Sequence, residues 1–267
     1  MKQSHYRLFA TVALLSCCWL MMTSFTLPRS QQESLLQYYS PFIASHDAKS
    51  VTMNNGTRIS LQQSHNAPDR LTPSQFENWL NTATLGDQLL QDYYAGKPEA
   101  PPQVNIEPGR ARSEEFFEAV YGASEHAVNS RCTTVRWTDG TPLRITTVLG
   151  CNKHLQAVVD ELKALPASFQ KYLARPGGTL NWRVIAGTKR RSTHSYGIAI
   201  DINVTHSHYW RNVRTVNGKL PYKNSIPIEI VEIFEKHGFI WGGKWYHFDT
   251  MHFEFRPELC PPRCSCK

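Results

Sequence analysis

The residues best suited to chemistry are concentrated in Ser192-Thr-His-Ser-Tyr-Gly-Ile-Ala-Ile-Asp201. The alternation of β-branched with small or polar residues after Gly197 predicts a strand, and it places Asp201 on the face opposite the isoleucines. Gly197 allows a tight turn that folds His194 back over the start of this strand. An imidazole and a carboxylate that converge in this way are two parts of a zinc site.

A third ligand is expected in Asp249-Thr-Met-His-Phe-Glu254, where His252 lies in an apolar run that predicts another strand. Catalytic zinc takes three protein ligands and keeps one position open, and two histidines with one carboxylate form such a set. In a regular strand Asp249 and His252 would point to opposite faces, so we expect a bend at Asp249-Thr250. With that bend, Asp249 can be a general base without being a ligand. Glu254 shares the strand face of His252 and is expected to orient its ring.

Other readings of these residues are open from the sequence. The chain has eleven histidines, so most have no part in a site. His206 and His208, two apart, are the main rival ligands, and His247 is a weaker one. Asp201 and Asp249 could each simply hold a turn.

The elements that must position the site follow from periodicity and turn residues. Apolar positions at helical spacing predict a helix from Asn152 to Pro166 and another over 226–237. Asp139-Gly140 predicts a hairpin between strands at 133–137 and 143–148. Pro176-Gly-Gly178 predicts a turn before a strand that carries Arg183.

Taken together, Ser-x-His-x-x-Gly-x-Ala-x-Asp, Trp241-Gly-Gly and Asp-x-x-His-Phe-Glu resemble the VanY-like D-alanyl-D-alanine carboxypeptidase family of zinc peptidases. The resemblance covers about Pro108 to Pro257. Aspartate at position 249, where carboxypeptidases of the family carry glutamate, is closer to the branch of phage endolysins that cut L-alanyl-D-glutamate bonds.

The resemblance implies zinc ligands at His194, Asp201 and His252 and a base at Asp249. It also implies that Arg183 lies beside the metal, although Arg190 or Arg191 could take that part. Ser192, which opens the first motif, is expected to support the ligands together with Glu254. The implied fold is α+β, with a small, mainly antiparallel sheet flanked by helices and preceded by an N-terminal helical segment.

The implied activity is zinc-dependent hydrolysis of a peptide bond in peptidoglycan stem peptides, with the L-alanyl-D-glutamate bond expected first. A D-alanyl-D-alanine carboxypeptidase is the alternative within enzymes. A non-catalytic wall-binding module is the alternative from another class. We expect a monomer, and nothing in the sequence indicates a nucleic-acid partner.

Composition and charge patterning predict export and a division of the chain into four parts. Residues 8–27 carry no charge and follow a short basic stretch, which is typical of a signal peptide or membrane anchor and places the rest in the cell envelope. The net charge is +7, and subtracting Lys2 and Arg7 of the leader leaves +5, an excess typical either of a solvated surface or of attraction to an anionic polymer such as cell wall. The expected parts are this leader (1–27), a helical segment with a Pro-rich connector (28–107), the zinc peptidase domain (108–259) and a Cys-rich tail (260–267).

Export would permit disulfides. Cys132 and Cys151 bracket the predicted hairpin and its exit, so we expect them to pair. The alternative is two buried thiols. A small disulfide loop is expected among Cys260, Cys264 and Cys266.

Overall fold

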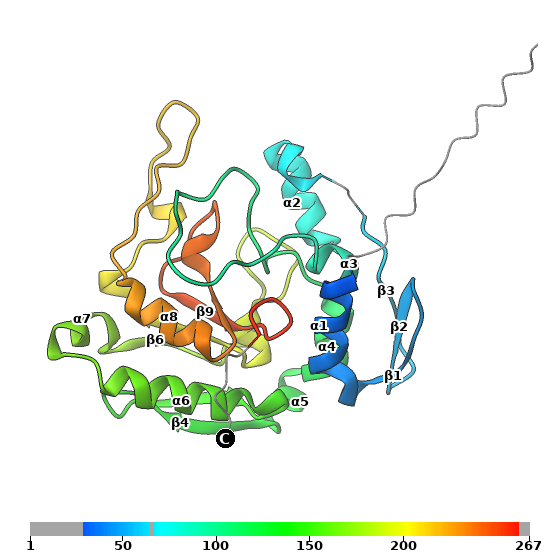
Figure 1. Ribbon diagram of the computed structural model, residues 1–267, viewed down its shortest axis with the longest axis horizontal. Coiled ribbons are helices and arrows are strands. Elements are labelled where there is room, and N and C mark those ends of the chain that lie inside the picture. The colour runs from blue at the N-terminus through cyan, green and yellow to red at the C-terminus, as the bar shows by residue number, and fades with distance from the viewer. Residues whose placement is uncertain (1–28, 65–66, 262–267) are drawn as a thin grey trace, which may run out of the picture.

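A computed structural model describes residues 29–64 and 67–261. The fold is α+β, with small antiparallel sheets flanked by helices (Figure 1), as the sequence led us to expect. The predicted leader at 1–27 and the cysteines at 264 and 266 lie outside the described residues. Across the part of the chain that is described, no helix has both the length and the apolar character needed to cross a membrane.

The central feature is a four-stranded antiparallel sheet in the order β6-β7-β9-β8. Its strands are β6 (Pro176–Gly178), β7 (Ala199–Asn203), β8 (Phe239–Trp241) and β9 (His252–Phe255). One face of β7 carries Ile200 and Ile202, which are fully buried in the apolar core. Because side chains alternate along a strand, Asp201 points to the other face. The alternation predicted for this strand is confirmed.

Two helices cover the apolar face of this sheet. The helix α8 (Ile228–Lys236) packs onto β9 through the stacked rings of Phe234 and Phe253, whose centroids are 3.9 Å apart. The helix α6 (Cys151–Lys163) contacts α8 and also the hairpin of β4 (Cys132–Arg136) and β5 (Pro142–Thr146). This hairpin and both helices were predicted from the sequence, with ends that differ by one to three residues.

The N-terminal part of the chain adds further elements to the same core. Figure 1 shows the helices α1 (Arg29–Tyr39) and α4 (Glu114–Tyr121) between the central sheet and a second sheet of three short strands. The Tyr39 ring lies 4.9 Å from that of Phe116, and both are fully buried in the main apolar cluster. The other elements of this part are β1 (Ile43–His46), β2 (Ser50–Met53), β3 (Arg58–Ser60), α2 (Pro73–Asn81), α3 (Leu85–Gln88) and α5 (Glu125–Asn129). The domain boundary at 107/108 stays a prediction, and the residues on its two sides share one core.

Two local predictions upstream of His194 were wrong. Pro176–Gly178 is not a turn but the edge strand β6, which pairs with β7 so that Gly178 faces Asp201. The segment that carries Arg183 is not a strand, because only a single bridge joins Val184 to Arg191. Pairing with β7, which no local pattern reveals, decides which of the two stretches becomes a strand.

The predicted disulfide between Cys132 and Cys151 is not supported by the structure. Both residues are thiols, Cys151 fully buried and Cys132 half-buried. The Cys132 thiol donates to the carbonyl of Val128 at 3.2 Å. Burial raises the pKa of both thiols, which keeps them protonated and slow to react.

Candidate metal centre

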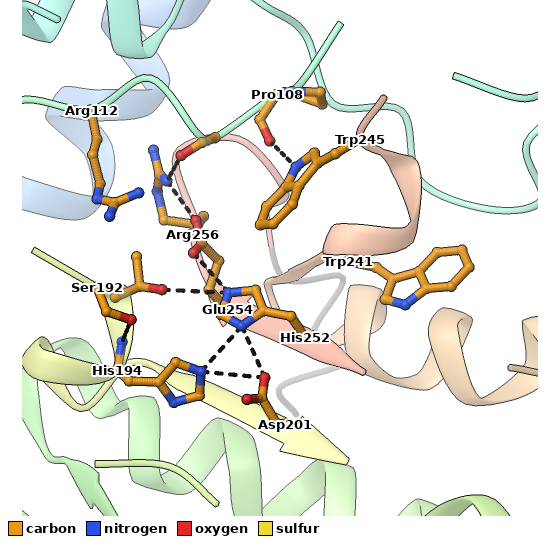
Figure 2. A network of polar contacts seen from close by, with 12 residues as sticks. Pro108, Arg112, Ser192, His194, Asp201, Trp241, Trp245, His252, Glu254 and Arg256 are labelled. Atoms are coloured by element: carbon orange, nitrogen blue, oxygen red, sulfur yellow. Dashed lines mark hydrogen bonds and ion pairs between the residues drawn. The ribbon is translucent and has the colours of Figure 1, made fainter. Parts of the chain in front are cut away.

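The structure brings His194, Asp201 and His252 together on the side of the sheet opposite the buried isoleucines of β7 (Figure 2). Asp201 and His252 are direct partners on the neighbouring strands β7 and β9. His194 comes from the turn Thr193–Tyr196 before β7. His194 Nε2 lies 3.2 Å from His252 Nδ1 and 3.3 Å from Asp201 Oδ1, and the last two atoms are 3.1 Å apart.

These three atoms have the chemistry and the spacing that a zinc ion requires. Tetrahedral zinc with bonds of about 2.0–2.1 Å holds its ligand atoms about 3.3–3.4 Å apart. The observed triangle has sides of 3.1–3.3 Å, so it needs almost no adjustment to close around an ion. His194 and His252 are buried, and Asp201 is one-quarter exposed toward the cleft. These residues therefore fit a three-ligand site with an open position.

The position of His194 is set by the turn that carries it and by the edge strand. Ser192 caps the turn, because its hydroxyl accepts from the His194 backbone N–H at 3.3 Å. Gly197 ends the turn with φ of 65°, a left-handed conformation that favours glycine. His194 Nδ1 lies 2.5 Å from the carbonyl of Thr179, next to β6. This carbonyl can only accept, so it fixes the proton on Nδ1 and leaves Nε2 free for a metal.

His252 is oriented in the same way from its other side. Its Nε2 lies 3.1 Å from Glu254 Oε2, so the N–H donated to this carboxylate leaves Nδ1 facing Asp201 and His194. Burial by itself would lower the pKa of His252, but the hydrogen bonds to Asp201 and Glu254 outweigh it and raise that pKa. Burial by itself would raise the pKa of Asp201, yet the two histidines hold the pKa of that carboxyl well below its usual range. The arrangement favours an anionic Asp201, as metal binding requires.

The bend expected before His252 is present and is built from the Trp241-Gly-Gly motif. The His252 N–H donates to the carbonyl of Asp249 at 3.2 Å, which closes a tight turn. The Asp249 N–H donates to the carbonyl of Gly242 at 3.0 Å, and the Trp241 indole donates to the carbonyl of Thr250 at 2.9 Å. A Cβ on Gly242 would lie 2.6 Å from the Asp249 carbonyl, so only glycine fits there.

The Asp249 side chain lies in the same cleft as the three candidate ligands. Its Oδ1 atom is buried and has no hydrogen-bond partner. Burial, together with the nearby Asp201, raises the pKa of Asp249 to about 6. A carboxylate in this state accepts a proton near neutral pH, which is what a general base must do.

The walls of the cleft are cationic and aromatic. Arg183 is exposed and lines it, and its backbone is tied to the His194 turn because the Arg183 N–H donates to Ser195 Oγ at 2.9 Å. Tyr209 and Trp210 also line the cleft, and their segment runs beside the Asp249 turn, because the Trp210 N–H donates to the Phe248 carbonyl at 2.9 Å. Further lining residues from outside the predicted motifs are Arg110, Arg112, Ile185 and Trp245.

None of the rival histidines joins the His194, Asp201 and His252 triangle. His206 packs on Tyr172, and His208 Nε2 lies 2.8 Å from Ser225 Oγ. His247 lines the cleft but contacts the buried carboxylate of Glu107. Among the described residues, only the His194, Asp201 and His252 set meets the spacing of a metal cluster.

Neither alternative arginine lines the cleft. The Arg190 guanidinium is buried against Glu77, at 2.9 Å. That of Arg191 stacks 4.0 Å above the Trp182 ring. Arg110 and Arg112 could not be assigned to the site from the sequence, because their only local signal is Gly109-Arg-Ala-Arg112 after a proline-rich stretch.

Residues 186–255 match a family model described as D-alanyl-D-alanine carboxypeptidase. The matched range contains His194, Asp201, Asp249 and His252 but ends before it reaches Arg183 on one side and Arg256 on the other. No curated protein and no solved structure matches the chain. The match supports a metallopeptidase of the carboxypeptidase type and gives no support to the narrower endolysin branch.

Proposed function

We propose that this protein is a zinc-dependent peptidase that hydrolyses a peptide bond in peptidoglycan stem peptides. The observation that carries the proposal is the triangle of His194, Asp201 and His252 atoms, sized for zinc, with the unpartnered carboxylate of Asp249 in the same cleft. The family match over residues 186–255 supports the same class of reaction.

Zinc in such a site acts as a Lewis acid and lowers the pKa of water toward roughly 7. His194, Asp201 and His252 would hold the ion. Asp249 takes the proton of the attacking water and hands it to the leaving amine. Its raised pKa suits both steps, because the carboxylate is strong enough as a base and its acid form can give the proton back.

Arg183 supplies positive charge on the exposed side of the cleft. It can stabilise the oxygen that becomes negative during attack or hold a carboxylate of the stem peptide. Its side chain makes no contact that the fold requires, whereas its backbone is fixed by Ser192 and Ser195. An exposed guanidinium that lines the cleft is suited to bind an anionic group of the substrate.

For the bond that is cut, we propose L-alanyl-D-glutamate, supported by the aspartate at position 249 in place of glutamate. The alternative is removal of the terminal D-alanine, and the description of the matching family favours it. A wall-binding module without activity would have no need for the Asp249 carboxylate in the cleft. We place the reaction outside the cytoplasm, because peptidoglycan lies there and the sequence of residues 1–27 predicts export.

The test is digestion of purified peptidoglycan by the zinc-loaded full chain, followed by mass spectrometry of the muropeptides. Peptides that begin at D-glutamate are the expected product. Release of D-alanine alone, with the L-alanyl-D-glutamate bond intact, would establish the carboxypeptidase alternative. Wall binding with no product at all would overturn the proposed enzyme.

A further inference from the structure

A chain of buried charged side chains starts at His252 on β9 and continues beyond the end of this strand at Phe255. His252 and Glu254 alternate along β9 with Phe253 and Phe255, which point into the apolar core, and Arg256 and Glu258 follow after the strand. The four polar residues are at most 7% exposed. His252 Nε2 lies 3.1 Å from Glu254 Oε2, and Arg256 then joins the two glutamates with Nη1 at 2.8 Å from Glu254 Oε1 and Nε at 2.6 Å from Glu258 Oε1. Figure 2 shows the part from His252 to Arg256.

The far end of this chain is held by the N-terminal part of the protein. Tyr39 of α1 donates its hydroxyl to Glu258 Oε2 at 2.9 Å. Gln88 of α3 donates its amide to Glu258 Oε1 at 3.1 Å. The Arg256 guanidinium also donates to the carbonyl of Gly109 at 2.7 Å. Tyr39 and Gln88 therefore both donate to the carboxylate of Glu258, although each lies more than 160 positions before it in the sequence.

Such a chain costs free energy to bury. The attraction between buried charges offsets the cost of removing them from water only where their geometry is good. A buried ion pair therefore contributes little net stability compared with apolar residues of similar size. Its effect on geometry is more definite. Glu254 gives one oxygen to the ring of His252 and the other to Arg256, so its carboxylate plane cannot turn while both contacts hold. Arg256 is fixed in turn by Glu258.

We propose that Arg256, Glu258 and Tyr39 are positioning residues that orient the metal-binding ring of His252 through Glu254. The inference rests on the proposed function, because it takes His252 as a zinc ligand. It gives the N-terminal part of the chain a role at the site: α1 supplies the hydroxyl that holds the last carboxylate of the chain. Groups that hold a ligand from behind tune metal affinity, and their loss weakens metal binding even though they never touch the metal.

The test compares zinc affinity in the full-length protein, measured by competition with a chromophoric chelator, with the melting temperature of the zinc-free form. Glu258→Gln keeps the shape and removes the charge, and Tyr39→Phe removes one hydroxyl. Direct partners of a ligand are worth 10–100-fold in affinity, so we expect about 10-fold weaker zinc binding for Glu258→Gln and about 3-fold for Tyr39→Phe.

The matched control is Glu235→Gln. Glu235 is 2% exposed, accepts from Tyr93 and pairs with Lys244, so it resembles Glu258 in burial and in partners but contacts no residue of the chain from His252. It should lower the melting temperature of the zinc-free form and leave zinc affinity unchanged.

Wild-type zinc affinity in both Glu258→Gln and Tyr39→Phe would overturn the inference alone. An equal loss in Glu235→Gln would also overturn it, because the effect would then follow from general destabilisation. A wild-type protein that binds no zinc would overturn the proposed function as well, so the two failures are distinguishable.

Discussion

The buried carboxylate of Asp249 should destabilise the zinc-free protein at neutral pH, and Asp249→Asn should remove that cost. The pKa of Asp249 is raised from 3.8 to about 6, mainly by burial and then by Asp201. The folded protein therefore holds a proton between pH 4 and 6 that the unfolded chain has released. Stability from this group is fully present below pH 4 and is lost as the pH rises through 6.

The magnitude follows from the size of the pKa shift. A pKa raised from 3.8 to about 6 corresponds to at most about 3 kcal/mol of lost stability at pH 7, since each tenfold change in proton affinity is about 1.4 kcal/mol. For a protein of this size, 3 kcal/mol corresponds to a change in melting temperature of about 6–12 °C. Asparagine has the shape of the protonated acid, so the variant should match the wild type near pH 4 and exceed it at pH 7.

Denaturant unfolding of both proteins at pH 4, 5, 6 and 7, in the presence of a chelator, measures this difference directly. Other groups titrate over the same range, and the difference between the two proteins removes the contributions of those that do not interact with Asp249. A stability difference that is the same at pH 4 and pH 7 would refute the reasoning. With zinc bound, the same variant should lose 10²–10⁴-fold in kcat while keeping its metal, because it lacks the base.

Three further outcomes are expected. Arg183→Ala should lower kcat/KM by roughly 10–100-fold with zinc content and melting temperature unchanged, since a charged hydrogen bond to substrate contributes about 1.5–3 kcal/mol; an unchanged kcat/KM would remove Arg183 from the site. Gly197→Ala should cost about 1–2 kcal/mol of stability because the turn is left-handed, and it should also weaken zinc binding because the new Cβ would lie 3.1 Å from Cys132 Sγ. The control is Gly140→Ala: Gly140 has φ of 87° and no atom within 4 Å of the new Cβ, so the variant has only the backbone strain and should leave zinc binding unchanged. His208→Ala should keep full zinc occupancy by elemental analysis, and loss of the metal would restore His208 as a ligand candidate.

The parts of the site that the sequence predicted are those with a local signal. The strand of Asp201 follows from its alternation, and the turn at Asp249 follows from the requirement that Asp249 and His252 share a cleft. Both predictions needed only the side-chain period of a strand.

The parts that could not be predicted depend on pairing between distant segments. Pro176–Gly178 has the composition of a turn and becomes a strand only because β7 offers a partner. Arg112 and Tyr39 are brought to the site or its supports by the packing of α1 and α4 on the core, and neither residue has a motif around it. The disulfide expected between Cys132 and Cys151 rested on predicted export and on the hairpin between them, and neither shows how the two side chains approach each other.

The direct pairing of Asp201 with His252 across β7 and β9 has a consequence for how the chain folds. If β9 slipped by one residue, Phe253 would take the place of His252 opposite Asp201, and every side chain of the strand would change face. No ligand set could form in that register, and the charges from Glu254 onward would meet the apolar core. An ion that binds only the correct register would stabilise that register over the slipped one, so metal binding would help to select the strand alignment.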